Sequence, residues 1–439
     1  MSTLKLSLVG FGSRLALMGL IMVNALLLAR FLGPQGFGEY FLFLRVISVL
    51  VVVADLGLSQ SVNAFFGRYE QWRAHLHGVI LRFVPAFAIC TSILGAILVR
   101  LAGNTLLPNF PGQLAWMAFA AIPMVLYAQV WISMMTGMGR IWQLNLVQLI
   151  INTLSLVLTL IFIVGLSGGV LVAATVYMTA VSIQFLVMLV IALRAQKRES
   201  EQAPADLSRQ MLHFGLRGYL GTFSYIVWTR VPVFLLNAFH GPAAVGIFSV
   251  AQNLVERMLL PVQAVQDACY RRMSILSTRA ATFSMNRYLR LTGWGMWAVV
   301  LLGVVLAPSV IVLLLGQKYA ASAQVVRILL PGIAFMGASF LLDTYFLNQL
   351  RRPGLLSILA WINALLSLTL ALLLIPALAE KGAALALVLT QITGTLIYFT
   401  LYLRISRTRL AQLFIIENDD LTLIRDQVGT MIGWKGGRG

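Results

Sequence analysis

The sequence predicts an all-α membrane protein with twelve transmembrane helices, arranged as two six-helix lobes around a central cavity. Three observations predict this fold class. The 439-residue chain is 60% hydrophobic and only 10% charged, with a mean hydropathy of +0.90, whereas a soluble domain carries about 25% charged residues. Apolar runs of roughly 20 residues, the length of a membrane-spanning helix, recur along the chain. A short motif also occurs twice, about half the chain apart.

The repeated motif occupies residues 31–41 and 239–249, an offset of 208 residues (241 − 33). A phenylalanine, a glycine, a proline and a second glycine fall on the same four places, and an aromatic residue follows. Each copy lies between two long apolar runs. Internal repeats of this kind are typical of secondary transporters, so we interpret the chain as two similar halves.

The apolar runs predict helices rather than strands, because backbone groups in lipid must find partners within their own segment. The near-continuous run at 150–164 lacks the alternation of a membrane β-barrel. The helices expected in the first half are 12–32, 38–62, 79–101, 114–136, 144–166 and 170–194. Those expected in the second half are 213–239, 245–269, 288–315, 321–349, 354–376 and 382–404.

These helices predict four regions along the chain. They are an N-terminal lobe at 1–194, a polar linker at 195–210, a C-terminal lobe at 211–404 and a tail at 405–439. Lys and Arg residues fall mainly on the side of both termini and the linker, while Arg30, Arg100, Lys318 and Lys381 fall on the other side. This bias predicts cytoplasmic termini with a cytoplasmic linker and tail.

The same loop bias explains the net charge of +18 without a nucleic-acid partner. Because both halves hold six helices, they share one orientation. We therefore expect a pseudo-two-fold axis along the membrane normal, with the cavity between the lobes in the bilayer.

The ionisable residues left inside the spans are the candidate functional residues. A charge at the centre of a bilayer costs about 2.5–3.5 kcal/mol on insertion scales, so it faces a wet cavity or a partner. Arginines outnumber acids in this set, which favours an anionic substrate, above all phosphate or pyrophosphate. Structural ion pairs are the alternative for the set, and snorkelling is another for Arg45 and Arg327. The expected substrate-binding residues are Arg230, Arg45, Arg257, Arg327 and Asn24, and the expected coupling residues are Glu256, Asp55 and Asp343.

Motifs of enzymes are missing from the sequence. It holds no Walker loop, no nucleophile–base arrangement and no metal-ligand spacing among its four histidines and two cysteines. We therefore expect neither enzymatic activity nor a cofactor or metal.

Three segments carry a family resemblance. Residues 29–40, 54–61 and 230–251 resemble the bacterial polysaccharide-biosynthesis flippases, which translocate O-antigen or exopolysaccharide repeat units. These belong to the multidrug/oligosaccharidyl-lipid/polysaccharide exporter superfamily. The resemblance implies two six-helix lobes, a cationic lumen and translocation of undecaprenyl-pyrophosphate-linked oligosaccharide to the periplasmic leaflet. It also implies a polysaccharide polymerase and a chain-length regulator as partners.

Other functions stay open as alternatives. A cation-coupled multidrug exporter of the same superfamily should have acids dominating its cavity and one in its first helix, where this chain offers Asn24. A flippase for lipid-linked peptidoglycan precursors typically has two further helices, and no apolar span follows Arg404. A membrane glycosyltransferase or polymerase should have large outer loops, whereas the longest one expected here is about 102–114.

Overall fold

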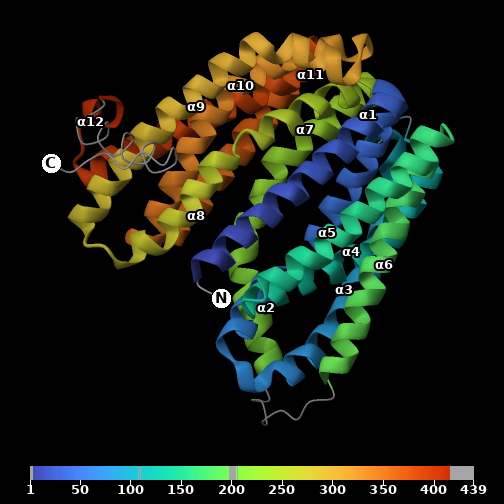
Figure 1. The fold of residues 1–439 in the computed structure, drawn as a ribbon, viewed down its shortest axis with the longest axis horizontal. Coiled ribbons are helices and arrows are strands. Elements are labelled where there is room, and N and C mark those ends of the chain that lie inside the picture. The colour runs from blue at the N-terminus through green and yellow to red at the C-terminus, as the bar shows by residue number, and fades with distance from the viewer. Residues whose placement is uncertain (1–2, 107, 109, 197–203, 205, 416–439) are drawn as a thin grey trace.

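The computed structural model describes residues 3–106, 108, 110–196, 204 and 206–415, and its elements there are all helical (Figure 1). The expected all-α fold class is confirmed. Half of the expected linker (197–203 and 205) and residues 416–439 of the expected tail lie outside the described residues. The first-half elements are α1 (Thr3–Asp55), α2 (Leu58–Arg68), η1 (Glu70–Trp72), α3 (Arg73–Leu106), α4 (Gly112–Gly137), α5 (Ile141–Thr159), η2 (Leu160–Gly165) and α6 (Val170–Gln196). The second-half elements are α7 (Leu207–Arg257), α8 (Leu260–Ile275), α9 (Thr278–Leu315), η3 (Gln317–Tyr319), α10 (Ala320–Thr344), η4 (Tyr345–Gln349), α11 (Pro353–Ser406) and α12 (Ala411–Phe414).

Nine helical spans in the described part of the chain are long and apolar enough to cross a membrane. Three of them contain a residue with non-helical backbone angles, at Gly33 in α1, Gly241 in α7 and Ala379 in α11. Dividing the spans at these breaks gives twelve helical segments (9 + 3). The number of membrane crossings and the two lobes with their boundaries stay predictions.

The repeated motif has the same backbone conformation in both copies. Gly33 has φ 69° and ψ 177°, and Gly241 has φ 78° and ψ −179°. A side chain is strained at such a positive φ, which explains the glycine. The proline that follows each glycine suits the first position of the next helical segment, where no backbone N–H donor is needed. The expected short loops at these places are therefore abrupt helix-to-helix breaks.

Two of the expected helices are interrupted, so their predicted bounds are wrong. The helix expected at 38–62 ends at Asp55, and positive φ angles at Leu56 and Gly57 separate it from α2. The helix expected at 245–269 ends at Arg257, and α8 begins at Leu260. Apolar composition continues through both breaks, and for this reason hydropathy alone did not indicate them.

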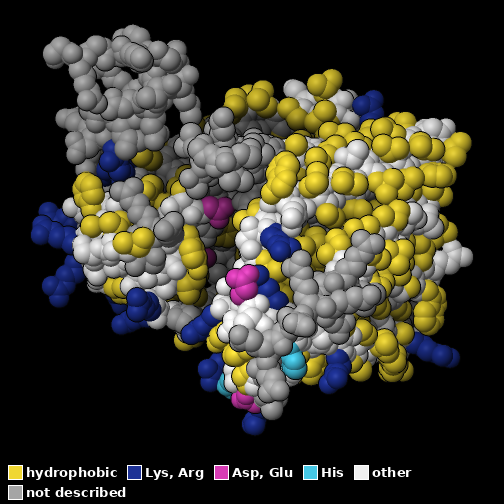
Figure 2. All heavy atoms as spheres, turned by 60° about the horizontal axis from the view of Figure 1, so that its bottom comes forward, with side chains coloured by type: hydrophobic (Ala, Val, Ile, Leu, Met, Phe, Trp, Pro, Cys, Tyr) yellow, Lys and Arg dark blue, Asp and Glu magenta, His cyan; other side chains and the backbone are white. Residues whose placement is uncertain are grey.

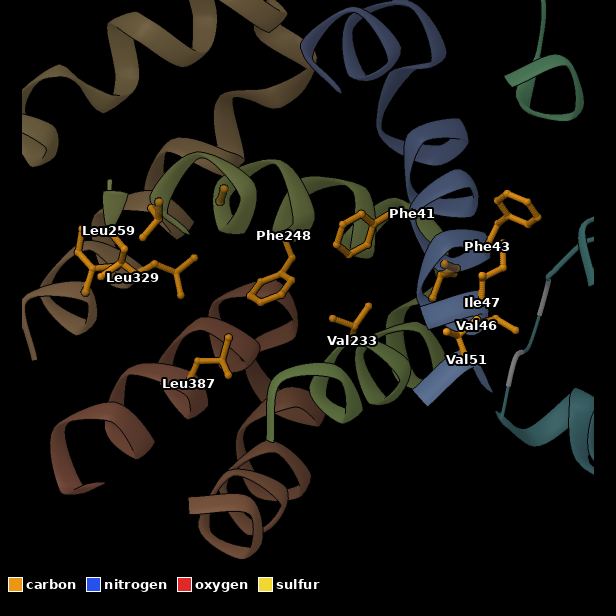
Figure 3. Packing of buried hydrophobic residues seen from close by; sticks show 14 of the residues in the cluster. Phe41, Phe43, Val46, Ile47, Val51, Val233, Phe248, Leu259, Leu329 and Leu387 are labelled. Atoms are coloured by element: carbon orange, nitrogen blue, oxygen red, sulfur yellow. The ribbon is translucent and has the colours of Figure 1, made fainter. Parts of the chain in front are cut away.

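Helices α1 and α7 pack against each other in the middle of the molecule. Helices α3 to α6 lie on one side of them and α8 to α11 on the other (Figure 1). Buried aromatic and aliphatic side chains from both halves fill the contact, including Phe41 and Val46 of α1 and Val233 and Phe248 of α7 (Figure 3). This pair of helices positions the cavities described below.

The two copies of the motif contact each other reciprocally. A Cβ atom built on Gly38 would lie 1.8 Å from the carbonyl oxygen of Pro242, and one on Gly246 would lie 1.9 Å from that of Pro34. With the offset of 208, these two contacts are equivalent. We call the end of the molecule that holds the Gly33 and Gly241 breaks the kink end.

Two hydrogen bonds at the kink end follow the same reciprocal pattern. The Tyr319 hydroxyl of η3 donates to the carbonyl of Ala29 in α1, at 2.9 Å. The Asn237 amide of α7, which is 208 residues after Ala29, donates to the carbonyl of Pro108 at 3.3 Å. Each half therefore holds the other's helix just before its break.

The opposite end, where the N-terminus, α2 and α8 lie (Figure 1), is the terminus end. Here α2 packs closely on α7, and a Cβ on Gly57 would lie 2.1 Å from the carbonyl oxygen of Gly215. The Ser61 hydroxyl donates to the Met211 carbonyl at 2.6 Å. In the described part of the chain α8 packs on α10, α9 and η4, and it has no contact of similar extent with α1.

Candidate transport cavity

Three cavities adjoin one another in the middle of the molecule. The Arg45 cavity, of about 320 Å³, is lined by both segments of α1 and by α5, α6, α7 and α9. The Trp228 cavity, of about 230 Å³, is lined by α7, α8, α10 and α11 and by Met18 of α1. The Asp343 cavity, of about 360 Å³, is lined by α7, α10 and α11. Arg257 lines the first two cavities, and Trp228 lines the last two, so the three form a series.

Arg45 is a buried cation with few partners. Its side chain is only 8% exposed, and its guanidinium carbon lies 4.2 Å from the centre of the Phe41 ring. The Nε atom has no hydrogen-bond partner in the described part of the chain. Asn24 lines the same cavity and donates to the Ser155 hydroxyl at 3.3 Å. An anion that reached this cavity would meet an arginine whose charge is not neutralised.

Arg257 is the residue that connects the Arg45 and Trp228 cavities. It is half-buried at the last position of α7, where the helix stops before α8. It interacts electrostatically with Glu256, and no hydrogen bond of its side chain occurs among the described residues. Its fork of N–H donors is thus free to bind a phosphate oxygen. The cavities bring together three predicted substrate residues, namely Asn24 and Arg45 of α1 and Arg257 of α7.

Glu256 lines the Trp228 cavity, where its Oε1 accepts a hydrogen bond of 2.9 Å from the Gln252 amide. Arg230, the residue expected to bind substrate most directly, is half-buried and interacts electrostatically with Glu256. Arg230 does not line the three cavities. Its expected role stays a prediction, and its position favours balancing the charge of Glu256.

Asp343 lies in a cavity that belongs to the second half alone. The Tyr398 hydroxyl donates to its Oδ1 at 2.7 Å. Asn363 lines the same cavity, and its buried Oδ1 has no partner in the described part of the chain. A carboxyl group held in a polar cavity between apolar helices is a candidate for binding a proton or a cation.

The remaining predicted residues lie elsewhere. Asp55 ends α1 and accepts from the backbone N–H of Ser59 at 3.1 Å, so it caps the start of α2. Arg327 is exposed, and its Nε donates to the carbonyl of Val304 in α9 at 3.0 Å. Neither residue lines the three cavities. Their expected roles in coupling and substrate binding stay predictions.

Sequence reasoning missed the uncharged polar lining. Tyr225 and Trp228 of α7 and Gln252, Gln263 and Gln391 line the Trp228 cavity. The sequence signal was weak, because single polar or aromatic residues within an apolar run also form ordinary interhelical contacts.

In the view of Figure 2, hydrophobic side chains cover much of the right-hand part of the molecule, as expected for a surface in contact with lipid. Lys and Arg side chains lie mainly along the left and lower edges, and a hollow lies between two masses.

The fold and its apolar spans define a multi-pass helical membrane protein. A solved structure described as the inward-facing conformation of a multidrug resistance MATE family transporter of the MOP superfamily is similar, with a TM-score of 0.69, 16% identity and coverage of 88% of this chain and 94% of that one. The lipid II flippase MurJ, in an inward closed conformation, has a TM-score of 0.69, 13% identity and coverage of 97% of both chains. A MOP superfamily transporter from Pyrococcus furiosus has a TM-score of 0.60, 17% identity and coverage of 91% of this chain and 95% of that one. At these identities the likeness establishes the fold.

A sequence profile described as "Polysaccharide biosynthesis protein" matches residues 4–265, which is more than half of the chain. The chain belongs to this family. No curated protein matches at a significant level. The chain thus combines membership of this family with the fold of the MATE and MurJ structures.

Proposed function

We propose that this protein is a flippase for undecaprenyl-pyrophosphate-linked oligosaccharide repeat units in polysaccharide biosynthesis. It moves them from the cytoplasmic to the periplasmic leaflet of the bacterial inner membrane by alternating access. In this orientation the terminus end faces the cytoplasm and the kink end faces the periplasm. A polysaccharide polymerase and a chain-length regulator are the proposed partners on the periplasmic side.

The observation that carries the proposal is the pair Arg45 and Arg257. One arginine comes from each half, and both line the same cavity between α1 and α7. A pyrophosphate bound between them would take bidentate hydrogen bonds from both halves. It would also supply the negative charge that the buried Arg45 guanidinium lacks.

The contacts at the two ends support one stage of the transport cycle. The reciprocal contacts at Gly38 and Gly246 join the two halves at the kink end, which the proposal places on the periplasmic side. At the terminus end, α2 is held against α7, and in the described part of the chain α8 has no contact of similar extent with α1. The lipid tail stays in the bilayer at the α1–α8 side while the pyrophosphate and glycan enter from the cytoplasm.

The experiment is a flipping assay in proteoliposomes. The extracted lipid-linked repeat unit is supplied in one leaflet, and its glycan is detected from the other side. Arg45→Ala and Arg257→Ala should each lower the rate at least tenfold, because losing a charged hydrogen bond costs about 1.5–3 kcal/mol. Arg45→Lys should keep part of the rate, since the charge remains but the bidentate fork is lost.

The matched control is Arg100→Ala, an exposed arginine of α3 that should have little effect. Normal flipping by both cavity variants would remove the pyrophosphate site. Arg327→Ala should also be nearly silent, and a large loss in that variant would restore its predicted role in binding.

Arg230 can be tested against its acidic neighbour. If Arg230 only balances Glu256, Arg230→Ala should lower flipping and the second change Glu256→Gln should restore it. A direct substrate contact, as first predicted for Arg230, would leave the double variant as slow as the single one.

A cation-coupled multidrug exporter is the second candidate, favoured by Glu256 beside Tyr225 and Trp228. A carboxylate next to aromatic faces suits an organic cation. Saturable transport of tetraphenylphosphonium that disappears in Glu256→Gln, without any flipping of the lipid-linked repeat unit, would favour this candidate.

A further inference from the structure

The Trp228 cavity has an aromatic wall. Tyr225 and Trp228 are one helical turn apart on α7, and their ring centres lie 5.5 Å apart at an interplanar angle of 88°. Tyr225 is 44% exposed although it lies in an apolar helix. Tyrosine and tryptophan side chains combine a large apolar ring with a polar group, so a cavity lined by both can make apolar and polar contacts with a ligand.

Other residues that line the same cavity are rich in hydrogen-bond acceptors. Glu256 is exposed, and the neighbouring Gln252 orients its amide nitrogen toward that carboxylate at 2.9 Å. The Gln252 oxygen is consequently turned away, and it has no partner in the described part of the chain. The oxygen of Gln391, which lines the same cavity, is also buried without a partner there. Buried acceptors without donors are costly, so these residues favour a ligand that brings hydroxyl or amide donors.

The amide of Gln263 adds an adaptable polar group at the start of α8. It is exposed, lines the cavity, and its side chain makes no hydrogen bond among the described residues. The cavity volume of about 230 Å³ is below the roughly 300–1,000 Å³ of drug-sized ligand sites. A single sugar ring fits this space better than a whole oligosaccharide or a lipid chain.

We propose that the Trp228 cavity is a subsite for one sugar ring of the glycan, built from Tyr225, Trp228, Gln252, Glu256 and Gln263. This inference rests on the proposed function. The sugar stacks on the aromatic wall, and its hydroxyl groups donate to Glu256 and to the glutamine oxygens. Arg257 lines this cavity and the Arg45 cavity, so the pyrophosphate binds beside the sugar subsite. The second half of the protein thus binds the sugar nearest the pyrophosphate, while both halves bind the phosphate groups.

The test measures binding to the full-length protein in nanodiscs with two lipid probes. One probe is undecaprenyl pyrophosphate, and the other is the same lipid carrying the repeat unit of the source organism. Trp228→Ala should weaken binding of the glycosylated lipid about tenfold and leave the bare lipid unchanged, as expected for an aromatic anchor. Gln263→Ala should do the same more weakly, and this exposed residue does not threaten folding. Arg257→Ala should weaken binding of both lipids.

The matched control is Trp297→Ala, which removes a tryptophan of α9 that packs edge-on against Phe335 outside the cavity. It should bind both lipids normally. Equal effects of Trp228→Ala on both lipids, or no effect on either, would overturn the sugar subsite alone. Competition by tetraphenylphosphonium that depends on Trp228 and Glu256 would replace the sugar by an organic cation. Failure of the unaltered protein to bind either lipid would overturn the proposed function itself.

Discussion

At the kink end the first and second halves contact each other through matching segments, whereas at the terminus end the described residues make only one of the two equivalent contacts. The kink-end contact joins Gly38 to Pro242 and Gly246 to Pro34. The terminus-end contact joins α2 of the first half to α7, and in the described part of the chain α8 has no contact of similar extent with α1. The contacts among the described residues are therefore closely two-fold at one end and one-sided at the other.

The difference between the two ends follows from the positions of glycine residues in the two halves of the sequence. Both copies of the motif have glycine at the crossing, so the backbones approach each other from either side. The break after α1 contains Gly57, which meets the backbone of Gly215. The break after α7 contains Met258 and Leu259 and no glycine. Close packing of membrane helices depends on small residues, so the second break lacks the residue type that allows the close contact at Gly57.

The largest effect is expected from substitutions that fill the contact between Gly38 and Gly246 at the kink end. The double variant Gly38→Ala with Gly246→Ala places a methyl group about where a carbonyl oxygen now lies on each side. Overpacking costs about 1–3 kcal/mol at each site, so the kink end should open and flipping should nearly stop. A cysteine at Asn24, in a protein without Cys90 and Cys269, should react faster with an impermeant maleimide added on the kink side.

The control for this variant is Gly19→Ala in the same helix, because a Cβ there meets no atom within 4 Å. This variant should flip the lipid-linked repeat unit, and its Asn24 cysteine should react with the maleimide, at the same rates as in the unaltered protein. Unchanged labelling in the double variant would show that the crossing does not close the Arg45 cavity.

A smaller change at the terminus end should act in the opposite direction. A Cβ on Gly215 would lie 2.6 Å from the Gly57 carbonyl oxygen and 2.7 Å from the Ser61 hydroxyl. Gly215→Ala should therefore separate α2 from α7 at a cost of about 1–3 kcal/mol and raise labelling of the Asn24 cysteine from the terminus side. Gly221→Ala, in the same helix with its nearest neighbour 3.9 Å away, is the control. Slower labelling in Gly215→Ala would contradict a gating role for this contact.

The sequence was sufficient for the helical fold and for the repeated glycine-proline breaks, because each leaves a local pattern. It did not indicate the breaks at Leu56–Gly57 and at Met258–Leu259, since hydropathy continues through both. It also could not tell which charged side chains share a cavity. A helix that is apolar all round has no periodicity to show its inner face, so Arg327 on the surface and Arg45 in the cavity looked alike.

The smallest expected effects are those of two single hydrogen-bond deletions, one at each end of the molecule. They test the comparison of the two ends most directly, because they should change the labelling rate of the Asn24 cysteine in opposite directions. Tyr319→Phe removes the hydrogen bond to Ala29 at the kink end, and Ser61→Ala removes the one to Met211 at the terminus end. Each loss is worth about 1 kcal/mol, or roughly a fivefold shift between the two states.

Both variants keep every side chain of the three cavities, so binding of the lipid-linked repeat unit should change only through the populations of the two states. Labelling of the Asn24 cysteine from the kink side should rise in Tyr319→Phe and fall in Ser61→Ala. The double variant should return close to the original rate, since the two residues lie at opposite ends and their effects add. Shifts of the same sign in both single variants would mean that the two ends open together, and alternating access between them would be wrong.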